Sequence, residues 1–331
     1  MSEQSIAVSI KDLSVEFPIG KTILGKPTLL TAVGNVSLDV PSGSFFGLVG
    51  ESGSGKTTLG RATLRAAPIS KGSITFRDRE GEQFELRHMS SKREKAFRRN
   101  AQLIFQDPYA ALSPRMTVRD IIAEPLEVMK LTKSRAETDE RVREIAAKCR
   151  LNVEHLRRFP HAFSGGQRQR ISIARALVTN PSYIVADESV AALDVSIQAD
   201  ILNLLKSLQR DMGLTFLFIS HDLSVVAHTC EMVAVMYLGS LVEIAPPRIL
   251  FTEPLHPYTK ALISAIPSLD PDHRQKAVKL SGEIPSPVNP PPGCKFHTRC
   301  PLATERCRAE APQFRDYEGH KVACHLVEKG A

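Results

Sequence analysis

The sequence predicts an α/β protein with a doubly wound, parallel-sheet core and a small C-terminal extension. Strand-sized apolar runs alternate with helix-compatible segments as far as residue 219, and a glycine-rich loop separates one such strand from the helix after it. Beyond residue 250 the composition changes to a proline-rich stretch, 285–293, and a cysteine-rich tail. We therefore expect a large domain over residues 1–250 and an extension over 251–331.

The N-terminal part of the core is expected to hold strands and one helix. Alternating apolar and polar residues predict strands over 8–17 and 33–40. The apolar run 45–49 predicts a buried strand that leads directly into the glycine-rich loop. The segment 58–67, after this loop, is compatible with a helix.

The rest of the core is interrupted by an insertion. The apolar strand 102–105 is followed by a proline-rich loop and by charge-rich helical sequence over 135–148, so residues of about 107–165 are expected to form a helical subdomain. The sheet then resumes with two apolar strands joined by an amphipathic helix. These three elements are expected over 183–186, 196–210 and 215–219.

Composition and charge exclude several classes of function. Hydrophobic content of 42% and charged content of 24% are ordinary for a soluble protein. No run approaches the roughly 18 apolar residues that a membrane span needs, and the N-terminus lacks a basic, apolar leader, so we expect a cytosolic location. Much of the net charge of +7 lies in residues 87–99, where aromatic residues do not alternate with the charges as a base-stacking platform would need. This pattern is typical of a solvated helix and disfavours nucleic-acid binding.

Residues 50–57 match the pattern G-x-x-x-x-G-K-[ST] of a phosphate-binding loop. Glycines let successive backbone N–H groups face phosphate oxygens, Lys56 adds positive charge, and the Thr57 hydroxyl can bind Mg²⁺. A plain glycine turn is a poor alternative, because the loop lies between a strand and a helix. The candidate ATP ligands in this stretch are Gly50, Ser52, Gly53, Ser54, Gly55, Lys56, Thr57 and Thr58.

Two carboxylates follow the apolar strand 183–186. Asp187 is expected to hold Mg²⁺ through water, and Glu188 to act as the general base toward the attacking water. Such a pair is by itself more typical of a solvated strand end, and the phosphate loop is what favours catalysis. His221 and Gln106 follow two other core strands, where His221 is expected to reach the γ-phosphate and Gln106 to sense Mg²⁺ and water.

Residues 163–170, Phe-Ser-Gly-Gly-Gln-Arg-Gln-Arg, indicate how the nucleotide is used. The serine and the glycines suit a helix start that binds a phosphate held on a second subunit. Two such half-sites imply a dimer that closes around ATP.

The cysteines are unevenly distributed, and four of the six lie in the last 38 residues, at Cys294, Cys300, Cys307 and Cys324. Cytosolic proteins seldom keep disulfides, so this cluster favours a metal or iron–sulfur centre. The spacing lacks close C-x₂-C pairs and leaves open a [4Fe–4S] cluster, zinc, or free or disulfide-forming thiols. Cys149 and Cys230 are expected to be ordinary buried thiols.

Together these motifs resemble the ATP-binding cassette (ABC) ATPase family over about residues 8–250. The family's landmarks occur in order as Gly50–Thr57, Gln106, Phe163–Gln167, Tyr183–Glu188, Ala191–Asp194 and His221. The resemblance implies a P-loop cassette with a RecA-like parallel core, an antiparallel β subdomain and a helical subdomain. It also implies head-to-tail dimers in which the ATP of the partner is contacted by Ser164, Gly165, Gly166, Gln167 and Asp194.

The resemblance implies further roles and shows two departures. Thr57, Gln106 and Asp187 would bind Mg²⁺, and Phe17 would stack on adenine, although a core position would explain Phe17 nearly as well. Ser189 stands where proline is usual, and Ala191 stands where serine is common. Neither departure removes a catalytic group, so ATP hydrolysis is expected.

Four segments resemble the oligopeptide/dipeptide branch of ABC importers, and within it the F-type ATPase subunit. They are residues 106–116, 121–126, 256–259 and 291–301. In related dipeptide importers the tail cysteines hold a [4Fe–4S] cluster, so the resemblance favours this cofactor, with zinc as the alternative.

The resemblance implies an ATP-hydrolysing subunit that energises the uptake of dipeptides or oligopeptides. The chain would be a peripheral protein on the cytoplasmic face of the plasma membrane, with a D-type partner ATPase, two membrane permeases and an extracytoplasmic binding protein. Nickel, glutathione or an opine-like sugar are alternative cargoes. A soluble non-transport ABC ATPase usually has two cassettes or a long coiled coil, and a redox-sensing iron–sulfur module leaves the ATPase motifs unexplained.

Overall fold

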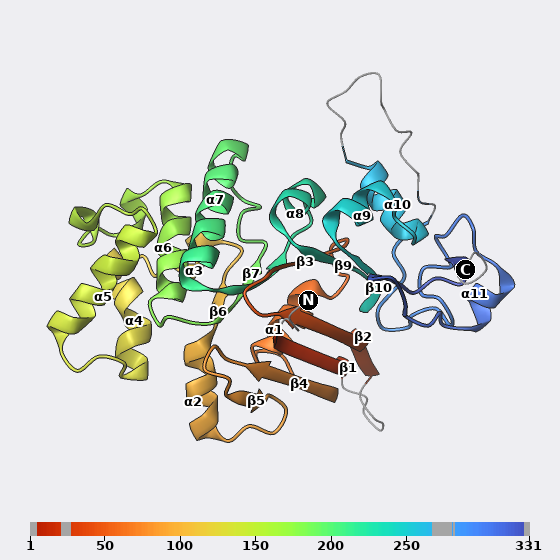
Figure 1. Ribbon diagram of the computed structural model, residues 1–331, viewed down its shortest axis with the longest axis horizontal. Helices are drawn as coiled ribbons and strands as arrows, with labels where there is room; N and C mark the ends of the chain where they lie inside the picture. Colours follow the sequence, from red (N-terminus) through yellow and green to blue (C-terminus); the bar gives the residue numbers. More distant parts are fainter. Residues whose placement is uncertain (1–4, 21–27, 267–279, 281, 328–331) are drawn as a thin grey trace. The chain divides into compact units, whose positions relative to one another are not determined.

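The computed structural model describes residues 5–20, 28–266, 280 and 282–327 (Figure 1). The chain forms two compact units. Unit 1 comprises Met1–Ser9, Asp39–Phe45 and Thr75–Ile219, and unit 2 comprises Ile10–Leu38, Phe46–Ile74 and Ser220–Ala331. Because each unit is assembled from separate stretches of the chain, a boundary near residue 250 stays a prediction.

The sheet of unit 1 is built from three parallel strands, as predicted. β6 (Ala101–Ile104) pairs with β7 (Tyr183–Asp187), and β7 pairs with β8 (Thr215–Ile219). Every residue of β7 and β8 is buried, as expected for parallel strands covered on both faces. Parallel pairing brings the carboxyl ends of these strands to one edge of the sheet.

The insertion after β6 is helical in unit 1. It contains α3 (Pro108–Ala111), α4 (Val118–Met129), α5 (Arg135–Lys148) and the short 3₁₀ helices Val153–His155 and Pro160–Ala162. α5 has the predicted bounds and begins after Ser134, whose side chain accepts a hydrogen bond from the Glu137 amide. α6 (Gly165–Leu177) packs against α3, α4 and α5, and Figure 1 shows α4, α5 and α6 side by side.

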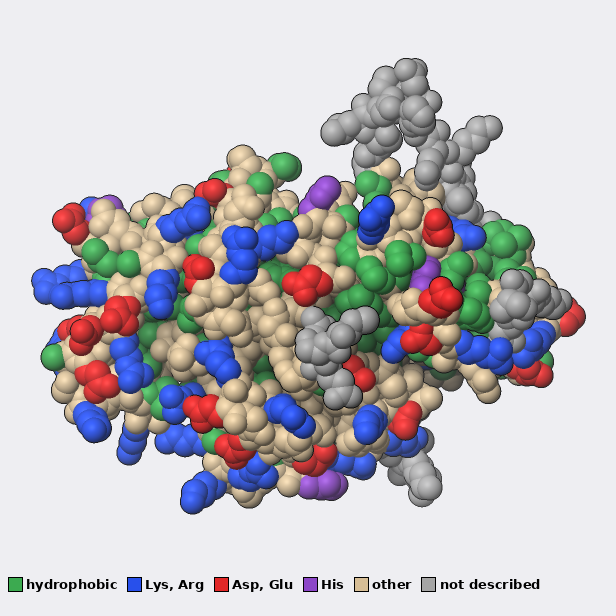
Figure 2. Space-filling view, in the orientation of Figure 1, with side chains coloured by type: hydrophobic (Ala, Val, Ile, Leu, Met, Phe, Trp, Pro, Cys, Tyr) green, Lys and Arg blue, Asp and Glu red, His purple; other side chains and the backbone are tan. Residues whose placement is uncertain are grey.

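Three further elements belong to unit 1. α7 (Val195–Met212) exceeds the predicted helix by one residue at its start and two at its end, and it stops at Gly213, whose φ of 60° is left-handed. α2 (Ser91–Asn100) holds most of the basic segment, and Phe97 is its only buried residue. β5 (Gln83–Glu85) precedes it. The other nine residues of α2 are at least partly exposed, so the prediction of a solvated helix is confirmed for this helix. Figure 2 shows Lys and Arg side chains interspersed with Asp and Glu over the face in view.

Unit 2 holds most of a second sheet, with the strand order β2-β1-β4. β1 (Ile6–Ile19) and β2 (Thr28–Pro41) are longer than the predicted strands, and β4 (Lys71–Arg77) was not predicted. In the middle of β2 buried and exposed residues alternate, which is the pattern that identified it in the sequence.

A five-strand run in unit 2 incorporates the C-terminal tail, in the order β11-β12-β10-β9-β3. β3 (Phe45–Val49) is fully buried as predicted and runs parallel to β9 (Met232–Tyr237). β10 (Ser240–Ala245) pairs antiparallel with both β9 and β12 (His320–Val322), and β11 (Arg315–Tyr317) completes the edge. The tail is therefore integrated into the sheet of unit 2.

Short helices complete unit 2. They are α1 (Lys56–Thr63), α8 (Leu223–Thr229), α9 (Pro247–Thr252), α10 (Pro257–Ser264) and α11 (Glu305–Ala309). α1 starts two residues earlier and ends four residues earlier than predicted. Within the described part of the chain, no helix has the length and apolar character needed to cross a membrane.

A buried polar network joins the tail to the body of unit 2. Glu243 on β10 is fully buried, and its carboxylate accepts hydrogen bonds from the amides of Leu255 (2.7 Å) and His256 (3.0 Å). The same carboxylate lies 2.6 Å from Nε2 of His320 on β12. Removing one partner would leave a buried polar group without its hydrogen bond, so this network anchors β12 to the body of unit 2.

The buried His256 makes the stability of unit 2 depend on pH. Burial lowers the pKa of His256 to about 3, and its Nδ1 accepts a hydrogen bond from the Tyr258 amide. Below pH of about 6.5 the unfolded chain binds a proton here and the folded chain does not, so stability falls as the pH drops toward 3. Between pH 6.5 and 5 the loss from this group is about 2 kcal/mol.

We expect His256→Asn, which keeps an N-cap acceptor, to lose less unfolding free energy than wild type between pH 6.5 and 5. The measurement is urea unfolding of both proteins. Equal losses in the two proteins would contradict this role of His256.

Candidate nucleotide-binding and hydrolysis site

The phosphate loop lies in unit 2, between β3 and α1, as predicted. Lys56 is buried, and its Nζ donates to the carbonyls of Gly50 (2.7 Å) and Glu51 (2.9 Å), so the loop curls around the ammonium group. Gly50 and Gly55 have φ of 150° and 101°, and a Cβ at either would come within 2.4 Å of a backbone oxygen. Glycine is therefore required at both positions on steric grounds.

The loop ends in the first turn of α1, whose backbone amides have no acceptor inside the helix. Thr57 and Thr58 are partly exposed in this turn, and Ser52 and Gly53 are exposed in the loop. Ser54 is buried and its carbonyl accepts from the Gly239 amide, which ties the loop to the turn after β9. A helix N-terminus with an adjacent lysine is suited to bind phosphate oxygens.

Unit 1 brings two predicted catalytic residues into contact. Gln106 follows β6 and Glu188 follows β7, and the Gln106 amide donates to the Glu188 carboxylate at 2.8 Å. Glu188 adopts a left-handed φ of 46°, and its amide donates to the Ile219 carbonyl at the end of β8. Asp187, the last residue of β7, is buried. The Gln106 contact therefore holds the proposed general base at the carboxyl edge of the parallel sheet.

The Ser-Gly-Gly-Gln segment forms the helix start that was predicted. Ser164 is the N-cap of α6, and it exchanges hydrogen bonds with Gln167 in a capping box. Gly166 is buried, and a Cβ there would lie 2.6 Å from Cγ2 of Ile197 on α7. Ser164 and Gln167 are exposed, so the cap faces solvent while the following glycine packs inward.

The other candidate residues are also placed, although their roles stay predictions. Asp194 is exposed at the N-cap of α7 in unit 1. Phe17 is half-buried near the end of β1, and His221 is exposed just before α8, both in unit 2.

Two models of known families match the chain. Residues 33–191 match the model described as ABC transporter, and residues 242–307 match that of the oligopeptide/dipeptide transporter, C-terminal region. YkfD of Bacillus subtilis (strain 168) is 51% identical over 305 residues, or 91% of both chains. The oligopeptide transport ATP-binding protein AppF of the same strain is 44% identical over 330 residues, or 98% of both chains. This chain belongs to the ATP-binding subunits of oligopeptide/dipeptide ABC transporters.

The fold agrees with this family. A solved dimer of the ATP-binding cassette MJ0796, in a post-hydrolysis state with ADP and Pi, has a TM-score of 0.62 and 26% identity to this chain. The match covers 73% of this chain and 99% of that one. The predicted ABC cassette fold is thus confirmed, and membership of the family implies ATP and Mg²⁺ as its ligands.

The two departures from the family pattern lie in a turn directly after Glu188. Ser189 is buried, and its Oγ has no hydrogen-bond partner among the described residues. Ala191 is exposed, and its amide donates to the Glu188 carbonyl at 3.1 Å. This backbone bond closes the turn without the proline that is usual at position 189.

The four tail cysteines do not form a metal site in the structure. Burial is the main cause that raises the pKa of Cys294 to about 11, and the neighbouring tail cysteines add to it. Within the described ranges, however, no group of three or more Cys, His, Asp or Glu side chains could hold a metal ion. The placement of these residues therefore does not support the expected iron–sulfur or zinc centre.

The remaining cysteines agree with their prediction as buried thiols. Burial raises the pKa of Cys149 to about 12, and Cys230 is buried against α8 and Gly47. The Cys149 thiol is therefore protonated at neutral pH.

Two residues that contact the phosphate loop were not predicted from the sequence. Arg299, in the extension, donates to the Glu51 carboxylate through two nitrogens, at 2.7 and 3.2 Å. The hydroxyl of Tyr258 on α10 accepts from the Glu51 amide at 2.9 Å. Arg299 and Glu51 are 248 residues apart, so no local pattern could have paired them.

Proposed function

We propose that this chain hydrolyses ATP to energise the uptake of dipeptides or oligopeptides across the cytoplasmic membrane. The observation that carries the proposal is the presence, on one chain, of the ABC transporter match and the oligopeptide/dipeptide C-terminal match. The name of AppF, an oligopeptide transport ATP-binding protein, supports the same cargo class.

Hydrolysis is assigned to residues that act on ATP as substrate. Lys56 and the first turn of α1 bind the phosphates, and Glu188 accepts the proton of the attacking water. Thr57, Gln106 and Asp187 offer hydroxyl, amide and carboxylate oxygens, a donor set suited to Mg²⁺, which would supply positive charge at the phosphate oxygens. His221 would contact the γ-phosphate, and the ring of Phe17 would stack on the adenine.

The start of α6 is proposed to bind the ATP that a second subunit holds. Ser164, Gly165, Gly166 and Gln167, with Asp194, would contact a nucleotide bound to the phosphate loop of a D-type partner. The exposed Ser164 cap supports this assignment, because a helix N-terminus open to solvent can accept an anion from another chain.

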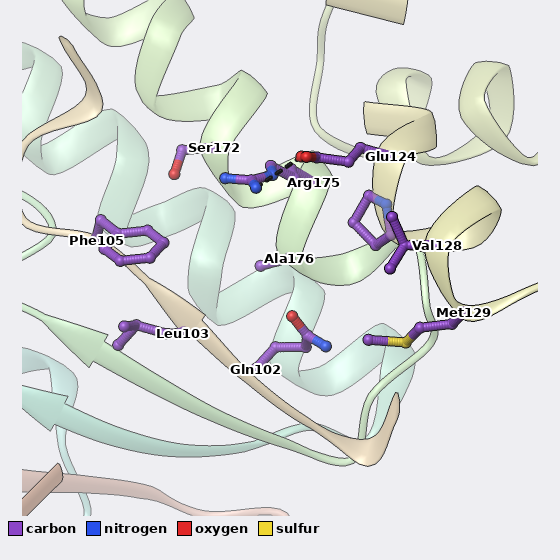
Figure 3. A pocket seen from close by; sticks show the side chains of 10 residues that line it. Gln102, Leu103, Phe105, Glu124, Val128, Met129, Ser172, Arg175 and Ala176 are labelled. Carbon is purple, nitrogen blue, oxygen red and sulfur yellow. Dashed lines mark hydrogen bonds and ion pairs between the residues drawn. The ribbon is translucent and has the colours of Figure 1, made fainter. Parts of the chain in front are cut away.

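A groove in unit 1 is suited to a cytoplasmic segment of a permease. It is a cavity of about 320 Å³ lined by β6, α4 and α6. Figure 3 shows Leu103 and Phe105 on the β6 side and Val128 and Met129 on the α4 side, with the Arg175–Glu124 ion pair (2.7 Å) beside them. Phe105 and Val128 are 43% and 71% exposed, so the groove offers apolar surface for a partner.

The groove is connected to the predicted site residues through α3. Arg175 also donates to the carbonyl of Ala111, at the end of α3. On the same helix the ring of Tyr109 lies 4.2 Å below the guanidinium of Arg168, one turn into α6. A permease segment in the groove would therefore act on both the loop after Gln106 and the start of α6.

We expect Val128→Asp to abolish co-purification of the permeases with this chain. The change places a charge in the apolar groove, and the exposed position keeps the fold intact. Val153→Asp, at another exposed valine of unit 1, is the matched control and should retain the permeases. Retention of the permeases by Val128→Asp would place their contact elsewhere.

In the proposed assembly this chain lies peripherally at the cytoplasmic face, together with a D-type ATPase, two membrane permeases and an extracytoplasmic binding protein. Its cargo is tested by ATP turnover of the reconstituted complex with the binding protein and candidate ligands. Stimulation by dipeptides or oligopeptides is the expected result. Stimulation only by nickel, glutathione or an opine-like sugar would assign the same ATPase to another cargo.

We also propose, on the strength of the resemblance alone, a [4Fe–4S] cluster at Cys294, Cys300, Cys307 and Cys324. Their gathering in one small segment is consistent with it, but their placement lacks ligand geometry. Iron and acid-labile sulfide in anaerobically purified protein would support the cluster, and one zinc per chain or no metal would reject it.

A further inference from the structure

A carboxylate stands in the phosphate loop itself. Glu51 is the second residue of the loop, in a position whose backbone and lysine are arranged for an anion. A bare carboxylate here would repel the triphosphate, since the two charges have the same sign and lie within a Debye length. The structure pairs this carboxylate with Arg299 of the extension through a bidentate contact.

The Arg299 side chain is nearly enclosed, and its backbone is hydrogen-bonded to that of the buried Phe296. Its side chain is 9% exposed, compared with 26% for Glu51, so solvent screens the pair less than a surface ion pair. The Arg299 amide donates to the carbonyl of Phe296, whose buried ring packs edge-on to Tyr237 with centroids 5.2 Å apart. The guanidinium thus approaches Glu51 from a pre-formed position.

Two further contacts fix the same part of the loop. The Tyr258 hydroxyl accepts from the Glu51 amide, and the Tyr258 ring packs against Tyr237 and Phe296. Lys295 acts less directly: its Nζ donates to the Leu238 carbonyl in the turn after β9, and the Gly239 amide of this turn donates to the Ser54 carbonyl of the loop. The main chain and the side chain of Glu51 are therefore both held by residues of the region that matches the oligopeptide/dipeptide C-terminal model.

We propose that Arg299 is a positioning residue for ATP binding: it neutralises Glu51 and holds the phosphate loop in the form that accepts a triphosphate. The extension thereby sets the ATP affinity of this chain, a role that rests on the proposed ATPase function. Without Arg299, the Glu51 carboxylate repels the phosphates and the loop samples other conformations, so only a fraction of molecules is competent to bind.

A double-mutant cycle on the full chain tests this role through the Kd for MgATP, measured by displacement of a fluorescent ATP analogue. Arg299→Gln is expected to raise Kd about tenfold, or about 1.4 kcal/mol. Glu51→Gln, which removes the repelling charge, should change Kd less than about twofold, and adding Glu51→Gln to Arg299→Gln should restore most of the lost affinity. Arg306→Gln, which removes an exposed ion pair of the same extension, is the matched control and should bind like wild type.

The possible results distinguish a failure of the positioning role of Arg299 from a failure of the proposed ATPase function. If wild type fails to bind MgATP, the proposed function fails; if it binds and Arg299→Gln binds equally well, the positioning role fails. The positioning role would also fail if Arg299→Gln lowered the affinity for MgATP equally in the wild-type chain and in the Glu51→Gln variant. Arg299 would then support the structure without acting through Glu51. Should Arg299→Gln not fold, Arg299→Lys provides the test: it keeps the charge but not the bidentate contact, and an intermediate Kd is expected, whereas a wild-type Kd would contradict the role.

Discussion

Glu188→Gln is expected to reduce the ATP turnover of the assembled complex by about 10²- to 10³-fold while ATP binding is retained. Glutamine has nearly the shape of glutamate but cannot accept a proton from the attacking water. Its carbonyl oxygen can still accept the hydrogen bond from the Gln106 amide, so the geometry at the end of β7 is preserved. The measurement is steady-state phosphate release, with nucleotide binding determined in parallel.

The matched control for this variant is Glu154→Gln, which neutralises an exposed carboxylate in a 3₁₀ helix of the same unit. This control should turn over ATP at the wild-type rate. Normal turnover by Glu188→Gln would exclude Glu188 as the general base. A loss of ATP binding together with turnover would assign Glu188 to the binding site instead.

Ser164→Ala is expected to lower turnover about 10- to 100-fold at the partner's phosphate loop, because a hydrogen bond to a charged phosphate contributes about 1.5–3 kcal/mol. ATP binding to this chain's own loop should be unchanged, since Ser164 would serve a nucleotide held by the other subunit. The measurement is photolabelling with an azido-ATP under turnover conditions, which reports trapped nucleotide on each subunit separately.

The control for Ser164→Ala is Ser134→Ala, which removes another exposed N-cap serine in unit 1. Both variants should lose about 1 kcal/mol of stability through the missing cap, and only Ser164→Ala should lose turnover. Equal turnover in the two variants would reduce Ser164 to a helix cap. Loss of trapping on this chain's own loop would mean that the α6 start does not act across subunits.

Much of the fold could be predicted because its signals are local. β3 and β8 are short runs of consecutive buried residues and were located at their observed bounds. α5 combines a serine cap with charge-rich helical sequence, and both of its ends were correct. The capping box at Ser164 is likewise encoded within four residues, so the start of α6 followed from the sequence.

The missed elements lack such signals. β11 and β12 are three residues each and largely polar, too short for any periodicity, and β12 is held by pairing with β10. The pair Glu51–Arg299 depends on the tertiary fold of unit 2, which brings together residues far apart in the chain. Helix α1 ended early because the turn after Thr63 closes with Arg65 in a left-handed conformation.

The candidate site was predictable as residues but not as contacts. Gln106 and Glu188 were each placed at the carboxyl end of a core strand, but the hydrogen bond between them was not predicted. No comparable rule relates the spacing of cysteines in the sequence to their positions in the fold. Among the described residues, the four tail thiols do not form the metal centre that was expected. Spacing alone does not determine where four side chains meet.

The central claim is tested most directly by uptake of a labelled oligopeptide into proteoliposomes that contain the complete transporter. With the binding protein and ATP present, we expect uptake with the wild-type chain and almost none with Glu188→Gln. Peptide accumulation at equal rates with both chains, or no uptake by wild type although ATP is hydrolysed, would contradict it.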